Sequence, residues 1–132
     1  MQTQEQRTGS LLVQRNMDLA RDILRAIAQN PQMNGVRDFF IESPEDLSVT
    51  GYSLEEVAHC LMLVDDAGFI NASANGLIVR RLTWDGFEFL DNIKSDSVWE
   101  KVKDQARSVC GVGMKVLASL AESEVKRLLG LS

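Results

Sequence analysis

The sequence is poor in the residues that build catalytic and metal sites. It has one histidine, two cysteines (Cys60 and Cys110) and no glycine-rich phosphate-binding motif. Two cysteines cannot make a disulfide framework, which favours a reducing compartment. No apolar run approaches the roughly 18 residues of a membrane span, and residues 1–9 lack signal-peptide character. We therefore expect a cytoplasmic, non-enzymatic protein that uses no cofactor, no metal and no membrane.

What the sequence does contain is the composition of an ordinary globular domain. Of its 132 residues, 45% are hydrophobic and 25% are charged, with a net charge of −5. A chain of this length buries roughly two-thirds of its unfolded surface, which suffices for one core. We expect a flexible tail over residues 1–14, a core domain over 15–94, and a helical extension over 95–132 that packs on the core or on a second subunit.

Apolar periodicity and capping residues predict a mainly helical chain. The best-defined helix runs from Leu54 to Ala67, because Ser53 and Glu56 form a capping box and Gly68 stands where a helix C-cap glycine belongs. The other predicted helices cover residues 17–29 with Asn16 as N-cap, a segment opened by Thr83, residues 97–109 with Ser97 as N-cap, and residues 114–129.

A β-hairpin is predicted directly after the best-defined helix. Residues 69–74 and 77–82 are β-prone and flank Asn75-Gly76, a pair that favours a type I′ turn. Further short elements are expected between residues 31 and 52: a strand or buried turn at 39–41, one helical turn from Pro44, and a short strand over 47–52.

This order of elements is typical of a winged helix, with the hairpin as the wing and residues 54–67 in the position of the recognition helix. The segments NMDLARDILRAI, GYSLEEVAHCLMLVDDAGFI and RLTWDGFEFLDNIKSDSVWEKVK also resemble a bacterial and phage family of short proteins classed as a domain of unknown function. That resemblance implies a winged-helix-like fold and a phage or prophage context, and it implies no activity.

A DNA-binding regulator is the first functional hypothesis, because winged helices of this size often bind DNA. Charge opposes it, since residues 53–68 carry four acids and no lysine or arginine beside which phosphates could lie. If DNA is bound, we expect contacts from the hairpin, through Arg80, Arg81, Asn75 and Gly76. A structural role for one of the arginines, paired with an acid on the neighbouring helix, is equally compatible with the sequence.

A protein-interaction or adaptor module is the second hypothesis, and we rank it first. The candidate surface is the acidic one of the predicted helix, facing a basic partner; its residues are Glu55, Glu56, Asp65 and Asp66. Such a surface could also mimic nucleic acid. The C-terminal extension has nearly balanced charge, which suits either a homodimer interface or packing within one subunit.

An enzyme is the weakest hypothesis. His59 and Cys60 are adjacent on a predicted helix and therefore diverge, so they do not form a nucleophile–base pair. Four aromatic residues are expected to form a core cluster between the hairpin and the C-terminal helices; they are Trp84, Phe87, Phe89 and Trp99.

Overall fold

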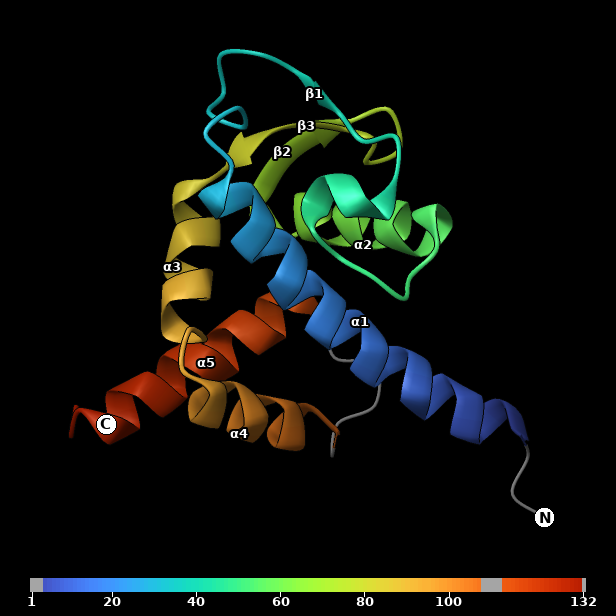
Figure 1. Ribbon diagram of the computed structural model, residues 1–132. Helices are drawn as coiled ribbons and strands as arrows, with labels where there is room; N and C mark the ends of the chain where they lie inside the picture. The colour runs from blue at the N-terminus through green and yellow to red at the C-terminus, as the bar shows by residue number, and fades with distance from the viewer. Residues whose placement is uncertain (1–3, 108–112, 132) are drawn as a thin grey trace.

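The computed structural model describes residues 4–107 and 113–131, with side chains described from residue 17 onward (Figure 1). It is mainly helical, with a small antiparallel sheet. In chain order the elements are α1 (Gln4–Gln29), β1 (Phe39–Phe40), the 3₁₀ helix η1 (Pro44–Leu47), α2 (Leu54–Asp66), β2 (Ile70–Ser73), β3 (Ile78–Leu82), α3 (Trp84–Asn92), α4 (Asp96–Arg107) and α5 (Met114–Leu128).

Helix α1 is longer than the sequence predicted. It begins at Gln4, not at Met17, so the predicted tail is helical over residues 4–14. Residues 1–3 lie outside the described part of the chain. The predicted N-cap, Asn16, lies inside the helix, because the preceding glutamines, glutamate, arginines and leucines are all competent helix formers.

Helix α2 has the caps that its sequence predicted. The Ser53 hydroxyl accepts from the Glu56 N–H, and the Glu56 carboxylate accepts from the Ser53 N–H, each at 3.1 Å. At the other end, Gly68 adopts a φ of +84°. The Phe69 N–H donates to the Val64 carbonyl, which closes a Schellman motif. These caps aim the chain from α2 directly into β2.

The sheet has the strand order β1-β3-β2, and all pairs are antiparallel. In addition to the two hairpin strands, the sheet contains the short β1, for which the sequence predicted a strand or a buried turn. Strand β3 carries a bulge at Arg80, because Asn71 pairs with Arg81 and Ala72 pairs with Val79. The Arg80 carbonyl accepts from the Gly35 N–H at 2.9 Å, so the bulge is tied to the loop before β1.

Two overlapping turns close the hairpin, and one of them has the predicted Asn75-Gly76 pair at its centre. The Gly76 N–H donates to the Ser73 carbonyl, which makes Ala74 and Asn75 the central residues, with φ values of +52° and +58°. In the second turn the Leu77 N–H donates to the Ala74 carbonyl at 3.1 Å, and the central residues are Asn75 and Gly76, with φ values of +58° and +87°, as a type I′ turn requires. Gly76 is buried, and a Cβ built on it would lie 2.7 Å from the Ala58 carbonyl oxygen of α2. The turn therefore folds against α2.

The core surrounds α1, which runs past the sheet and α2 at one end and past α4 at the other (Figure 1). Ile23, Leu24 and Ile27 of α1 are almost completely buried. Helix α4 packs on α1, and α5 packs on α3 and α4 of the same chain. Among residues 4–107 and 113–131, no helix is both long and apolar enough to cross a membrane.

Two smaller predictions are wrong. Residues 47–52 form no strand, because Leu47 and Val49 are buried individually around the end of η1. Helix α4 begins at Asp96, and the Val98 N–H points to the Ser95 hydroxyl, so Ser95 takes the capping position that was assigned to Ser97. The predicted C-terminal end of this helix near Val109, and Cys110, lie outside the described residues.

Candidate interaction surfaces

The four acidic residues of α2 do not form one patch. Glu56 is half-buried and closes the capping box. Asp65 is half-buried, and its Oδ1 accepts from the Ala72 N–H beside the bulge at 3.1 Å. Glu55 and Asp66 are exposed, but eleven residues of helix place them about 16 Å apart.

The outer face of α2 is nevertheless anionic. Glu55, His59, Met62 and Asp66 share this face at helical spacing, and α2 contains no lysine or arginine. The face therefore carries two exposed carboxylates and one imidazole. Phosphate groups would meet repulsion there, whereas a basic protein surface would meet attraction.

The residues predicted as hairpin contacts to DNA differ in how far they are engaged within the chain. The Arg80 Nε lies 3.3 Å from the Asp38 Oδ1, and its Nη2 donates to the Gly35 carbonyl. The acidic partner is thus in the loop before β1, not on a helix. Arg81 is exposed and donates to the Leu82 carbonyl. Asn75 is exposed, but the burial of Gly76 removes it from any contact surface.

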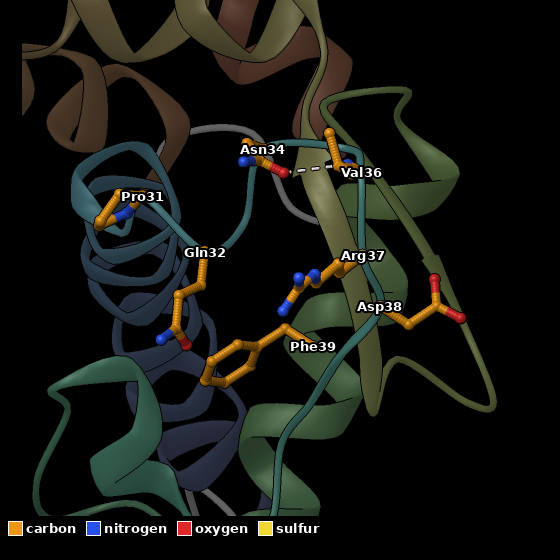
Figure 2. A pocket seen from close by; sticks show the side chains of 7 residues that line it. All are labelled: Pro31, Gln32, Asn34, Val36, Arg37, Asp38 and Phe39. Atoms are coloured by element: carbon orange, nitrogen blue, oxygen red, sulfur yellow. Dashed lines mark hydrogen bonds between the residues drawn. The ribbon is translucent and has the colours of Figure 1, made fainter.

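A hollow of about 540 Å³ lies between the end of α1 and β1 (Figure 2). Its lining runs from Pro31 to Phe39, and the Asn34 side chain holds the loop through the Val36 N–H at 2.9 Å. The Arg37 side chain extends toward the Phe39 ring, whereas Asp38 points away (Figure 2). The sequence offered no signal for this hollow, because a loop conformation forms it.

The predicted aromatic core cluster is correct for only two of its four members. Phe89 stacks on Phe69 with ring centroids 5.0 Å apart, and Trp99 is 1% exposed. Trp84 is 76% exposed and Phe87 is 50% exposed. Since Trp84 and Phe87 are three residues apart on α3, both fall on its outer face and the buried face belongs to Phe89.

This outer face of α3 combines aromatic rings with carboxylates. Trp84, Phe87, Glu88 and Asp91 line a surface hollow of about 260 Å³. The Trp84 Nε1–H donates to the Glu88 Oε1 at 2.8 Å, which orients the indole ring. Their spacing along the sequence places all four on one helix face. The sequence therefore predicts that they share a face, but large aromatic residues are commonly buried, so it does not predict that this face is exposed.

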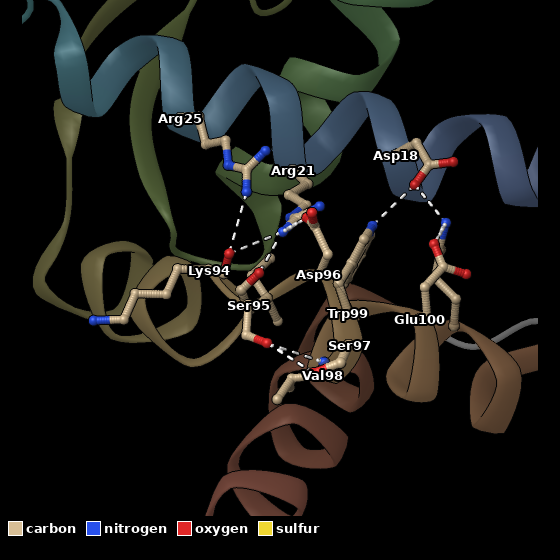
Figure 3. Close-up of polar contacts among 12 residues, drawn as sticks. Asp18, Arg21, Arg25, Lys94, Ser95, Asp96, Ser97, Val98, Trp99 and Glu100 are labelled. Carbon is tan, nitrogen blue, oxygen red and sulfur yellow. Dashed lines mark hydrogen bonds and ion pairs between the residues drawn. The ribbon is translucent and has the colours of Figure 1, made fainter.

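A polar cluster built around the buried side chains of Arg21 and Lys103 joins α1 to the C-terminal helices (Figure 3). The Arg21 Nε donates to the Ile93 carbonyl at 3.1 Å, and its Nη2 donates to the Lys94 carbonyl at 3.1 Å and to the Asp96 Oδ1 at 2.9 Å. Arg21 therefore satisfies carbonyls at the end of α3 and a carboxylate at the start of α4. Its hydrogen bond to Asp96 lowers the pKa of that carboxyl.

Asp18 is the second centre of this cluster. Its Oδ1 accepts from the Trp99 Nε1–H at 2.9 Å and from the Lys103 Nζ at 2.8 Å. Burial lowers the pKa of Lys103, but hydrogen bonds to Asp18 and Glu100 outweigh that effect and raise it overall. Since each group has a partner within the chain, we assign the cluster a structural role.

Cys60 and His59 are placed on different sides of α2. Cys60 is completely buried, and desolvation raises the pKa of its thiol to about 12. At neutral pH the thiolate population is then very small, and Cys60 behaves as a packed apolar group. In the described part of the chain, no three His, Cys, Asp or Glu side chains gather in a way that could hold a metal ion.

The fold and these surfaces define a mainly helical protein with a small antiparallel sheet, whose distinctive exposed features are charged and aromatic faces. The family model described as "Hypothetical protein (DUF2513)" matches residues 14–113, and the chain belongs to this family. An uncharacterized protein of Haemophilus influenzae is 31% identical over 126 residues, which cover 89% of this chain and 99% of the relative. No solved structure matches the chain.

Proposed function

We propose that this protein is a non-catalytic binding module, built on a winged-helix scaffold, whose partner is a protein. The scaffold assignment is supported by the element order and by the strand order β1-β3-β2. In that arrangement α2 occupies the position of the recognition helix, and β2 and β3 form the wing.

The observation that carries the proposal is the outer face of α2. A recognition helix that enters the major groove passes close to phosphates on both sides, and DNA-binding proteins place cations there. Here the exposed charged groups are Glu55 and Asp66, and the helix contains no lysine or arginine. We propose that Glu55 and Asp66 contact basic groups of the partner protein.

The folded-back hairpin turn supports the same conclusion. A wing that contacts DNA projects from the domain, but Gly76 is buried against Ala58 of α2. The Arg80 guanidinium is engaged by Asp38 and Gly35. Both features reduce the number of hairpin groups that can contact a phosphate backbone.

A DNA-binding regulator is the second candidate, and one observation favours it. Arg80 and Arg81 both lie against Gly35, and the exposed Arg37 follows two residues later. These three arginines provide a basic region on which a phosphate backbone could lie, with α2 turned away from the duplex.

The two candidates are separated by measuring DNA binding at two salt concentrations. We expect no saturable change in the fluorescence anisotropy of a labelled 20-base-pair duplex with up to about 100 µM protein, even at 50 mM salt. This concentration limit is sufficient, because proteins that bind DNA non-specifically would saturate the duplex below it at low salt. Binding that weakens steeply at 200 mM salt, and disappears in Arg80→Ala, Arg81→Ala but not in Lys101→Ala, Lys115→Ala, would establish the regulator instead.

The protein partner is tested by charge reversal on α2. We expect the partner captured from a lysate to be lost with Glu55→Lys, Asp66→Lys and retained with Glu45→Lys, Asp104→Lys, which makes the same charge change on the exposed surfaces of η1 and α4. Partners that survive both variants equally would contradict the assignment of α2 as the contact surface. Circular dichroism of both variants checks that the fold is retained.

Self-association through the C-terminal helices is a further alternative for the partner. Exposed apolar side chains gather at the end of α5 and just after it, at Leu128, Leu129 and Leu131. However, Leu117 and Ala121 of α5 are already buried within the chain. We expect a mass of about 15 kDa by light scattering at 50 µM. A mass near twice this value that reverts with Leu128→Gln, Leu129→Gln would show a homodimer.

A further inference from the structure

We propose that the outer face of α3 is a second contact site, which receives an arginine-containing cationic segment of the partner protein. The inference deepens the proposed function and rests on the partner being a protein. It assigns the site to Trp84, Phe87, Glu88 and Asp91, and it names the guanidinium group as the chemistry that this site recognises.

The first argument is the exposure of two large aromatic rings. Trp84 and Phe87 are 76% and 50% exposed, although the same helix buries Phe89 almost completely. One face of α3 is buried against Phe69 and α5, and the aromatic residues of the opposite face stay exposed. Exposed tryptophan is strongly enriched among the residues that dominate binding energy at protein interfaces.

The second argument is the chemistry of the lining. The hollow over the rings is lined by two aromatic rings and the carboxylates of Glu88 and Asp91, and no cation is among its lining residues. Aromatic faces and carboxylates both attract guanidinium groups, the first through the ring quadrupole and the second through charge-assisted hydrogen bonds. Arginine fits this combination better than lysine because its planar group stacks on a ring while donating at its edge.

The third argument is that the carboxylates are available. Glu88 uses one oxygen to accept from the Trp84 indole at 2.8 Å, and a carboxylate has further acceptor positions. Asp91 is paired with Lys94, at 3.6 Å, and both side chains are about three-quarters exposed. Such surface pairs are weak and readily exchanged, so an incoming cation can replace Lys94.

A second copy of this chain is a less suitable occupant. A two-fold symmetric interface through this face would bring its own carboxylates close to those of the other copy. Like charges juxtaposed in an interface oppose association. The complementary occupant therefore carries positive charge, and the face itself is predominantly acidic.

The test uses the two indole N–H groups as paired reporters in a ¹H–¹⁵N spectrum of the full chain. The probe is an acetylated and amidated Gly-Arg-Gly-Arg-Gly peptide, and the matched control peptide has citrulline in place of arginine. We expect the Trp84 indole signal to shift saturably with the arginine peptide and to remain unchanged with the citrulline peptide. The Trp99 indole is buried and bonded to Asp18, so its signal should not move.

Variants then assign the binding to the rings. Trp84→Ala and Phe87→Ala should each weaken binding of the arginine peptide about two- to fivefold. Because Trp84→Ala removes the indole reporter, binding to that variant is measured from the backbone amide signals of α3. Val116→Ala, which changes an apolar residue of α5 about as exposed as Phe87, should leave it unchanged. Both aromatic side chains are mostly exposed, so the variants are expected to fold.

Three results would overturn this inference. The first is that the citrulline peptide binds as well as the arginine peptide, and the second is that the Trp84 signal does not respond to either. The third is a dimer that dissociates in Trp84→Ala, Phe87→Ala, which would assign the face to a second copy. In each case, loss of the partner in the α2 charge-reversal variant would still support the proposed function. Failure of the α3 site can therefore be distinguished from failure of the proposed function.

Discussion

Asp18 illustrates how a single carboxylate can support several elements at once. Its Oδ1 accepts hydrogen bonds from Trp99 and from the nearly buried ammonium of Lys103. Asp18→Ala should destabilise the protein by about 2 kcal/mol, because it leaves a charged donor and an indole N–H without their acceptor. Urea unfolding monitored by circular dichroism measures the change.

The control for Asp18 is Asp104→Ala on α4. Asp104 forms an exposed pair with Arg107 at 2.8 Å, and surface pairs of this kind contribute only about 0.5 kcal/mol. Equal destabilisation by the two substitutions would show that burial of the Asp18 partners has no energetic consequence.

Cys60 provides a second prediction at the level of one residue. With its thiol pKa raised to about 12 by burial, it should react with a disulfide reagent at pH 8 at least about 100-fold more slowly in the folded protein than in urea. The Cys110→Ser background isolates the reaction of Cys60. Fast reaction of the folded protein would mean that α2 opens readily.

At the level of elements, the contact between the hairpin turn and α2 depends on Gly76. Gly76→Ala should cost about 1 kcal/mol for its positive φ and about 2 kcal/mol more for the clash with the Ala58 carbonyl oxygen. Gly51→Ala is the matched control, because Gly51 also has a positive φ but a Cβ there would meet nothing within 4 Å. Similar unfolding free energies for the two variants would contradict the packing of the turn on α2.

The elements also show what the sequence could and could not predict. The caps of α2, the hairpin and the helical segments follow from residues within a few positions of one another, and these local signals predicted them. The burial of Arg21 and Lys103 was not predicted, because it depends on partners more than seventy residues away. The spacing of Trp84 and Phe87 places both on one face of α3, but it is the packing of the opposite face on Phe69 and α5 that leaves them exposed. Among the acidic residues of α2, the capping-box pattern predicted the bond from the Ser53 N–H to Glu56, whereas the bond from the Ala72 N–H to Asp65 was not predicted, because it depends on how β2 lies against α2.

For the whole molecule, acid stability should depend on the link between Arg21 and Asp96. The hydrogen bond from Arg21 holds the pKa of Asp96 below its usual range. A lowered carboxyl pKa contributes stability above the unfolded pKa of about 3.9, and this contribution is lost as pH falls through the folded value. Asp96→Asn should therefore flatten the loss of melting temperature below about pH 4.

Melting temperatures recorded by circular dichroism from pH 6 to pH 2.5 test this expectation. The control is Asp104→Asn, which removes a carboxylate from the same helix without touching Arg21. Equal flattening in both variants would attribute the effect to net charge and not to the Arg21 link.

The bonds from α1 to α4 have a consequence for how the chain matures during synthesis. Asp18 and Lys103 are 85 positions apart, and Arg21 and Asp96 are 75 apart. A ribosome releases α1 long before α4 exists, so the part of α1 that packs on α4 has no partner until the last third of the chain is made. Translation that stops before residue 96 would leave a fragment in which the part of α1 around Asp18 is uncovered, and such a fragment would be a substrate for chaperones and proteases.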